Sequence, residues 1–95
     1  MKWRIEGEAR AELESAFEWY EAARPGLGAQ FLDEFEAGVR QVTAAPHSWH
    51  PLGSRLRRFR LRRFPYGIVY RVEDDEIVII AVAHLRRRPG YWRNR

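Results

Sequence analysis

The sequence predicts an α+β protein in which an N-terminal strand and an antiparallel helical hairpin accompany a three- to four-stranded, mainly antiparallel sheet. Two patterns predict it: apolar residues recur at helical spacing in the first half of the chain and alternate in the second half. A length of 95 residues with 45% hydrophobic content fits one domain, residues 1–95, with a single core. We expect the hairpin to cover one face of the sheet.

Two amphipathic helices are predicted in the first half. Over residues 8–24 the apolar side chains form one stripe and glutamates occupy the remaining face. The Pro-Gly-Leu-Gly segment at residues 25–28 interrupts this pattern, and a second helical period runs from residue 29 to Pro46. So short a break predicts an antiparallel helical hairpin. Gly38 lies on the apolar face of the second helix, which predicts a close approach to the first helix or to the sheet.

The remaining segments read as strands. Residues 3–5 alternate and predict a short edge strand. Phe59 and Leu61 alternate with arginines, which predicts a strand with one buried and one basic face. Residues 66–72 also alternate, whereas residues 77–83 form an unbroken apolar run, the pattern of a central strand covered on both faces.

Tight turns at residues 64–65 and 74–75 set a testable register. If both are two-residue hairpins, Arg63 lies opposite Tyr66, and Glu73 lies opposite Glu76. The face packed against the helices then carries Phe59, Leu61, Tyr66, Ile68, Tyr70, Val72, Ile77, Ile79, Ala81 and Ala83. The opposite face carries Arg58, Arg60, Arg62, Gly67, Val69, Arg71, Val78, Ile80, Val82 and His84.

This second face combines arginines around His84 with an apolar stripe. Two helices cover one sheet face only, so the β-branched stripe predicts a docking groove. Its partner would be acidic and amphipathic, with carboxylates that meet the arginines. The arginine row alone fits a solvated face equally well. The residues assigned to this groove are Val69, Arg71, Val78, Ile80 and Val82.

Charge is divided unequally along the chain. Residues 1–50 hold five Lys/Arg against nine Asp/Glu, whereas residues 51–95 hold twelve Arg against four acids, so the halves carry −4 and +8. The basic half favours an acidic protein or a nucleic acid as partner.

Several classes of function are disfavoured by composition. The chain has no cysteine, which excludes a disulfide scaffold, a thiolate metal site and a cysteine nucleophile. Its three histidines lack metal-ligand spacing and no glycine loop would cradle a phosphate, so neither metal nor cofactor is expected. No apolar run reaches the ~20 residues of a membrane span, and no signal peptide is apparent. We expect a soluble, cytoplasmic protein without membrane partners.

A metal-independent RNA cleavage site is one chemical possibility. It needs a general acid or base near the 2′-hydroxyl and leaving oxygen, and a cation that stabilises the phosphorane charge. The candidates for these roles are His84, Arg62, Arg86, Arg87 and Tyr91.

Five stretches together resemble the RelE/ParE superfamily of type II toxin-antitoxin toxins, also described as plasmid-stabilisation proteins. They are Glu18-Trp19-Tyr20-Glu21, Arg24-Pro25-Gly26-Leu27-Gly28 with Phe31, Pro46 with Trp49, residues 62–71, and Val82-Ala83-His84-Leu85-Arg86-Arg87. They span nearly the whole chain in the order of the predicted architecture. The resemblance implies a growth-inhibiting toxin held inactive by an acidic antitoxin encoded nearby, in a toxin-antitoxin hetero-oligomer.

The superfamily has two mechanistic branches. RelE-like members are ribosome-dependent mRNA endonucleases, whereas ParE-like members poison DNA gyrase. The nuclease branch usually has an arginine where this chain has Gly67, and a second one where an ungapped match gives Leu85. These departures favour the ParE-like branch, with RNA cleavage on the ribosome and a degenerate, non-toxic interaction module as alternatives. The residues predicted to engage the target are Arg58, Arg60, Arg62, Arg86, Arg87, Arg88, Tyr91 and Trp92.

Overall fold

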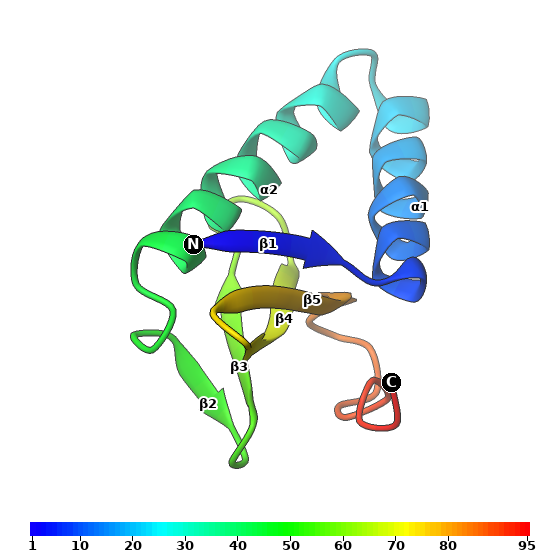
Figure 1. The fold of residues 1–95 in the computed structure, drawn as a ribbon. Helices are drawn as coiled ribbons and strands as arrows, with labels where there is room; N and C mark the ends of the chain where they lie inside the picture. The colour runs from blue at the N-terminus through cyan, green and yellow to red at the C-terminus, as the bar shows by residue number, and fades with distance from the viewer.

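Two helices and five strands build the chain, which a computed structural model describes over residues 1–95. In order they are β1 (Lys2–Ile5), α1 (Gly7–Ala23), α2 (Leu27–Ala44), β2 (His50–Leu52), β3 (Leu56–Arg60), β4 (Tyr66–Glu73) and β5 (Glu76–His84). The sheet order is β1-β5-β4-β3-β2 (Figure 1). Only β1 and β5 pair in parallel. Neither helix combines the length and apolarity needed to cross a membrane.

The predicted α+β architecture is confirmed: the helical hairpin packs on one face of a mainly antiparallel sheet, and β1 is an edge strand. The sheet has one strand more than the upper expectation. This is β2, which contains Pro51 and which the alternation of apolar residues did not predict. Proline removes a ladder donor but is tolerated in an edge strand, and β2 is the last strand on its side of the sheet.

Gly38 allows α2 to approach the sheet closely. The sequence predicted a close approach either to the first helix or to the sheet, and the structure shows the second. A Cβ atom added there would lie 3.0 Å from the Phe59 ring and 3.1 Å from Ile68. The neighbouring Phe35 and Val39 of α2 are buried in the same core. The small residue therefore lets α2 lie directly on β3 and β4.

Gly28 allows a similarly close contact between α1 and α2. A Cβ atom there would lie 2.8 Å from the Phe17 ring and equally close to the Phe17 carbonyl oxygen of α1. Backbone oxygen cannot rotate away as a side-chain tip can, so only glycine fits where the two helices meet. The Glu21 carboxylate accepts hydrogen bonds from the Gly26 and Gly28 amides and holds the connection in place.

The β4–β5 hairpin has the predicted register, with Glu73 opposite Glu76. Its two turn residues, Asp74 and Asp75, have φ angles of 51° and 60°. A two-residue type I′ turn requires positive φ at both positions, and aspartate is among the residues that tolerate it.

A bulge in β5 overturns the predicted faces beyond the middle of the strand. Tyr70 pairs with Ile79 and Val69 pairs with Ala81, so Ile80 has no partner on β4. One extra residue inverts every side chain that follows it. The placements of Ala81 and Ala83 against the helices, and of Val82 and His84 on the opposite face, were therefore wrong.

The β3–β4 connection is longer than a tight turn. Arg60, rather than Arg62, pairs with Gly67, so residues 61–65 form the loop. The shift of two residues leaves Arg58 and Arg60 on the predicted face but removes Arg62 from the sheet. The physical reason is Phe64, which turns inward and packs its ring edge-on against those of Tyr20 and Phe31, at 4.8 and 5.2 Å.

We predict that Gly28→Ala destabilises the protein by roughly 1–3 kcal/mol, because the new methyl group forces the helices apart at the Phe17 carbonyl. Urea unfolding followed by circular dichroism measures the change. Gly7→Ala is the matched control, since nothing lies within 4 Å of its added Cβ in the first turn of α1. An equal loss in both variants would contradict this account of the helix contact.

Candidate functional site

The structure divides the predicted nuclease residues: His84 and Arg87 line one hollow, and Arg62 and Arg86 line another. His84 lies on the helix-packed side, with its ring 5.1 Å from that of Tyr66. Its Nδ1 atom accepts a hydrogen bond from the Arg86 amide at 3.1 Å. Arg58 and Arg60 project from the opposite face of β3. The expectation that the arginine row surrounds His84 was wrong, because the β5 bulge carries the histidine to the other side.

Tyr91 is engaged in a structural contact. Its hydroxyl donates a hydrogen bond to Oε2 of Glu12 at 2.6 Å. Burial, reinforced by this hydrogen bond, raises the pKa of the Tyr91 phenol above its ordinary value. The Arg87 guanidinium lies over the Tyr91 ring at 4.2 Å. The phenol therefore stays protonated and committed to Glu12.

Glu12 on α1 collects several donors, an arrangement that we call the Glu12 clasp. Its carboxylate accepts hydrogen bonds from the Val82 amide at 3.0 Å, from the Tyr91 hydroxyl, and from Arg95 at 2.8 and 3.1 Å. Arg95 also donates to the Ile80 carbonyl at 3.0 Å. The pairing of β1 with β5 ends at Ile79, so the clasp satisfies the β5 edge beyond that point.

The clasp holds residues 85–95 across the face of the sheet that the helices leave free (Figure 1). Trp92 is only 6% exposed and packs in a second apolar cluster with Val69, Val78 and Ile80, each at most 2% exposed. Tyr91, Leu52 and Leu56 border this cluster. The chain therefore fills the predicted docking groove itself.

Most of the residues predicted to bind the antitoxin are therefore not accessible on the surface. Val69, Val78 and Ile80 are closed beneath the C-terminal segment, and Val82 belongs to the helix-side core. Arg71 is half-buried and pairs with Glu73 at 2.8 Å. An uncovered apolar stripe was therefore the wrong expectation.

One group of the predicted target-binding residues is brought together. The β3–β4 loop and the start of the C-terminal segment meet where the Leu85 amide donates to the Pro65 carbonyl at 2.8 Å. They line a shallow groove of about 500 Å³. Four arginines border it, which we call the loop-end patch: Arg60, Arg62, Arg63 and Arg86.

Arg63 was not predicted as a site residue, and the structure explains its position. Its amide and Nε atoms donate to the Glu34 carboxylate of α2 at 2.7 and 3.0 Å. Burial raises the pKa of Glu34, but these hydrogen bonds outweigh it and leave the pKa below its ordinary value. Glu34 thus stays ionised and anchors the loop that carries the patch.

The other predicted target-binding residues lie apart from the patch. Arg88 is exposed, and Arg87 approaches Glu12 at 3.6 Å. The stem of Arg58 packs on Gly67, 3.0 Å from where a Cβ would lie. Trp92 is buried and Tyr91 is held by the clasp, so neither ring is presented to a partner. No group of three or more His, Asp or Glu side chains is placed to hold a metal ion.

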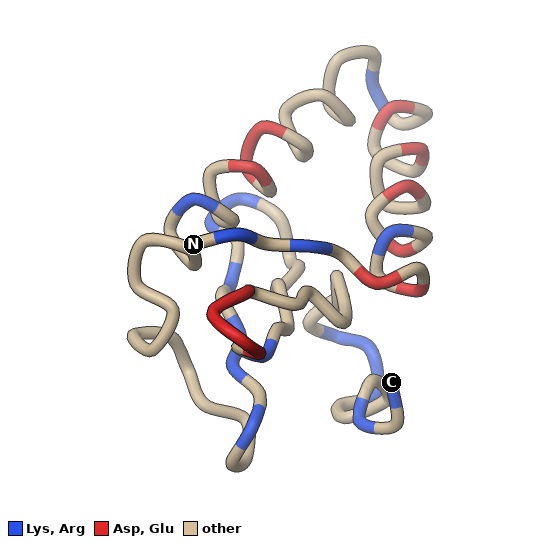
Figure 2. Tube along the Cα trace, viewed as in Figure 1, with Lys and Arg blue, Asp and Glu red and all other residues tan.

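Charge along the fold follows the division seen in the sequence. Figure 2 shows acidic positions along both helices and at the β4–β5 turn, and basic positions along β3 and the C-terminal segment. The loop-end patch is the part of this basic region where four exposed or loop-held guanidinium groups converge on one hollow.

Comparison with known proteins places the chain in a family. The family model described as ParE toxin of type II toxin-antitoxin system, parDE, matches residues 4–89. The chain belongs to the ParE toxin family. Toxin ParE2 of Mycobacterium tuberculosis, in strains CDC 1551 and H37Rv, is 31% identical over 88 residues, which cover 92% of this chain and 84% of the relative.

A solved structure supports the fold of this ParE family member. The structure described as the chromosomal ParDE TA system from P. aeruginosa superposes with a TM-score of 0.79, at 20% identity. The match covers 90% of this chain and 97% of that one. The resemblance to the ParE-like branch of the superfamily is thereby confirmed, together with the α+β architecture.

We predict that Glu12→Gln costs this ParE protein roughly 2–3 kcal/mol of unfolding free energy, because the partly buried Arg95 keeps only the exposed Glu8 as an anionic partner. Urea unfolding measures the loss, and amide hydrogen exchange should show faster exchange at Val82. Glu14→Gln, an exposed position on the same helix, serves as control and should change stability by less than about 0.5 kcal/mol. Equal unfolding free energies for the two variants would show that Glu12 stabilises the fold no more than an exposed glutamate does.

Proposed function

We propose that this chain is the toxin of a type II toxin-antitoxin pair and inhibits growth by binding DNA gyrase. Family membership supports the toxin role. The solved neighbour belongs to a ParDE system, which supports a cognate antitoxin as the partner in a hetero-oligomer. The basic half of this chain favours an acidic antitoxin. The gyrase target follows from the ParE-like branch that the sequence resembles.

The observation that carries this proposal is the division of the candidate nuclease groups between two separate hollows. His84 and Arg87 line one hollow, whereas Arg62 and Arg86 line another. The Tyr91 hydroxyl is bonded to Glu12. Gly67 stands where the nuclease branch has an arginine. Loss of one group that stabilises transition-state charge costs about 3 kcal/mol, or roughly 100-fold in rate. Binding to a protein target requires no such constellation.

The loop-end patch is the surface we assign to the target. Its four arginines share one groove and all four are exposed, although Arg63 is also paired with Glu34. The patch would meet an acidic surface of gyrase, and exposed charges of this kind chiefly accelerate association. Inhibition should therefore weaken as salt concentration rises.

The mRNA endonuclease alternative has one observation in its favour. His84, Tyr66 and Arg87 line a single hollow of about 240 Å³ beside α1. An imidazole and a guanidinium in one hollow are groups that RNA cleavage uses. A substitution at His84 separates the two mechanisms.

We predict that the purified protein blocks gyrase supercoiling and that the double variant Arg60→Glu, Arg62→Glu needs about tenfold more protein for the same inhibition. His84→Ala should inhibit supercoiling and growth as the wild type does. Primer extension on translated mRNA provides the second readout. New 5′ ends that vanish in His84→Ala would contradict the gyrase proposal in favour of ribosome-dependent cleavage. Normal growth during expression of the wild type would indicate a degenerate, non-toxic interaction module.

A further inference from the structure

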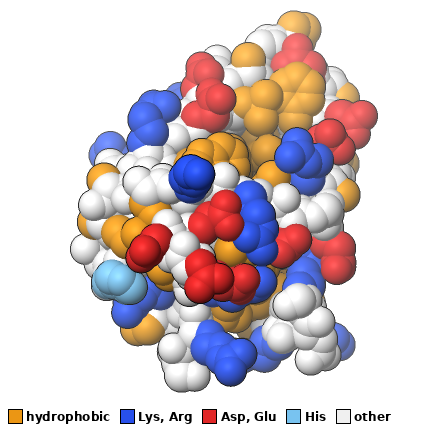
Figure 3. Space-filling model, viewed as in Figure 1, with side chains coloured by type: hydrophobic (Ala, Val, Ile, Leu, Met, Phe, Trp, Pro, Cys, Tyr) orange, Lys and Arg blue, Asp and Glu red, His pale blue; other side chains and the backbone are white.

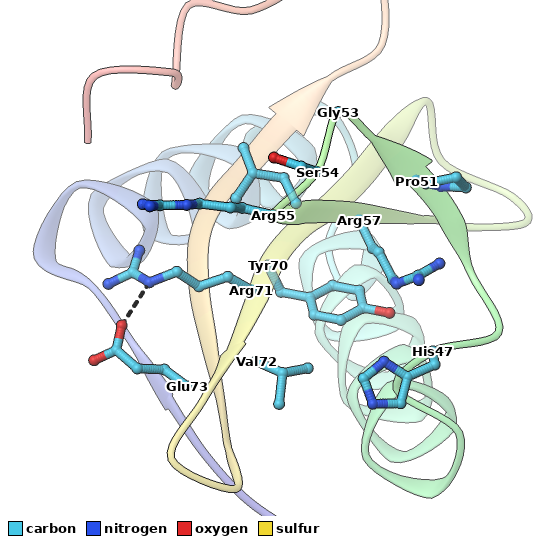
Figure 4. Close-up of a pocket in the computed structure, with 11 residues that line it drawn as sticks. His47, Pro51, Gly53, Ser54, Arg55, Arg57, Tyr70, Arg71, Val72 and Glu73 are labelled. Carbon is cyan, nitrogen blue, oxygen red and sulfur yellow. Dashed lines mark hydrogen bonds and ion pairs between the residues drawn. The ribbon is translucent and has the colours of Figure 1, made fainter.

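We propose that a notch at the other end of β3 binds an acidic, extended segment of the antitoxin. The notch is a cavity of about 430 Å³ at the sheet edge (Figure 4). Among the residues that line this arginine notch, as we call it, are His47, Arg55, Arg57, Tyr70, Arg71 and Val72, with one carboxylate, Glu73, which Arg71 neutralises. The inference rests on the proposed partnership with an antitoxin and assigns that partner a place on the fold.

The notch exists because β4 is longer than the strand beside it. Pairing between β3 and β4 ends at Arg57 and Tyr70, while β4 continues to Glu73. The Leu61 amide donates to the Tyr66 carbonyl, so Tyr66 and every second residue after it direct their peptide groups toward β3. By this alternation the peptide group of Val72 faces the notch, where an added strand would meet it.

Three guanidinium groups surround this open edge. Arg55 makes no hydrogen bond or ion pair with the rest of the protein and is exposed. Arg57 donates one hydrogen bond, from Nη1 to the Trp49 carbonyl at 2.9 Å, and keeps its other donors. Arg71 donates a hydrogen bond from Nε to the Glu73 carboxylate and has its Nη donors free of hydrogen bonds. The notch therefore holds unused donors that suit a carboxylate.

The wall of the notch is fixed before any partner arrives. The Tyr70 hydroxyl donates to the Pro46 carbonyl at 2.7 Å and ties the loop after α2 to β4. Burial raises the pKa of Tyr70 to about 12, so this donor keeps its proton at neutral pH. In Figure 4 the Tyr70 hydroxyl, Arg57 and His47 lie on the same side of the cavity. A preformed site avoids the ordering cost of binding.

The surroundings favour an acidic peptide over a nucleic acid. Arg71 lies 3.8 Å from Glu6, and Arg4 joins Glu6, Glu73 and Glu76 in the same network. Figure 3 shows acidic and basic side chains interleaved across the middle of one face. These carboxylates oppose any polyanion that extends beyond the notch, so a short acidic segment fits better than a continuous phosphate backbone. The free peptide group of Val72 also selects a polypeptide, because a nucleic acid has no backbone amides to pair with it. An extended acidic segment would bring carboxylates to Arg55 and Arg57 while its backbone meets the peptide group of Val72.

The test uses the purified full chain and a capped synthetic peptide of alternating glutamate and valine, followed by ¹H–¹⁵N NMR. We expect the peptide to shift the Val72 amide signal, and the glutamine-for-glutamate peptide to bind far more weakly. Arg55→Ala should raise the dissociation constant about tenfold through loss of a charge-assisted contact. Arg10→Ala, an exposed arginine of α1 outside the notch, should leave it unchanged.

Three results would overturn the proposal: no shift at Val72, equal affinity in Arg55→Ala, or tighter binding of single-stranded oligothymidylate at the same residues. Gyrase inhibition by the same preparations tests the proposed function separately, because the loop-end patch lies at the opposite end of β3. If the peptide does not bind but gyrase inhibition is intact, the notch proposal is wrong and the proposed function stands.

Discussion

The Glu12 carboxylate satisfies an exposed sheet edge and fixes the end of the chain at the same time. β1 is too short to pair with all of β5, which leaves the Val82 amide and the Ile80 carbonyl without strand partners. Glu12 accepts from the first and Arg95 donates to the second. Because the same two side chains pair with each other, the edge and the C-terminal segment are stabilised by one contact. Both side chains are about 15% exposed, so breaking the pair would leave a buried charge.

The clasp also decides which surfaces remain for partners. With Trp92 packed on Val69 and Ile80, the sheet face opposite the helices is a second small core. Two accessible arginine-lined hollows remain at the ends of β3, where the loop-end patch and the arginine notch are formed by different arginines. On the proposed function, the first surface serves the cellular target and the second serves the antitoxin. A partner bound at the notch would then not need to cover the loop-end patch by direct contact.

Local periodicity was sufficient to predict the helices and the β4–β5 turn at Asp74 and Asp75, and the resembling stretches indicated the family. It was insufficient for the faces of β5, because an unbroken apolar run reads the same in either register and hides the extra residue Ile80. The loop-end patch was partly predictable, since its arginines cluster in the sequence. The clasp was not, because Glu12 and Arg95 are 83 positions apart and no local pattern distinguishes Glu12 from the other glutamates of α1.

The packing of Trp92 tests the central claim most directly. The measurement is a nuclear Overhauser spectrum of the wild-type protein, which detects protons in van der Waals proximity. The account predicts contacts from the Trp92 ring to the methyl groups of Val69 and Ile80, which belong to the same buried cluster. Random-coil shifts throughout residues 85–95, with no such contacts, would contradict a C-terminal segment that closes the sheet.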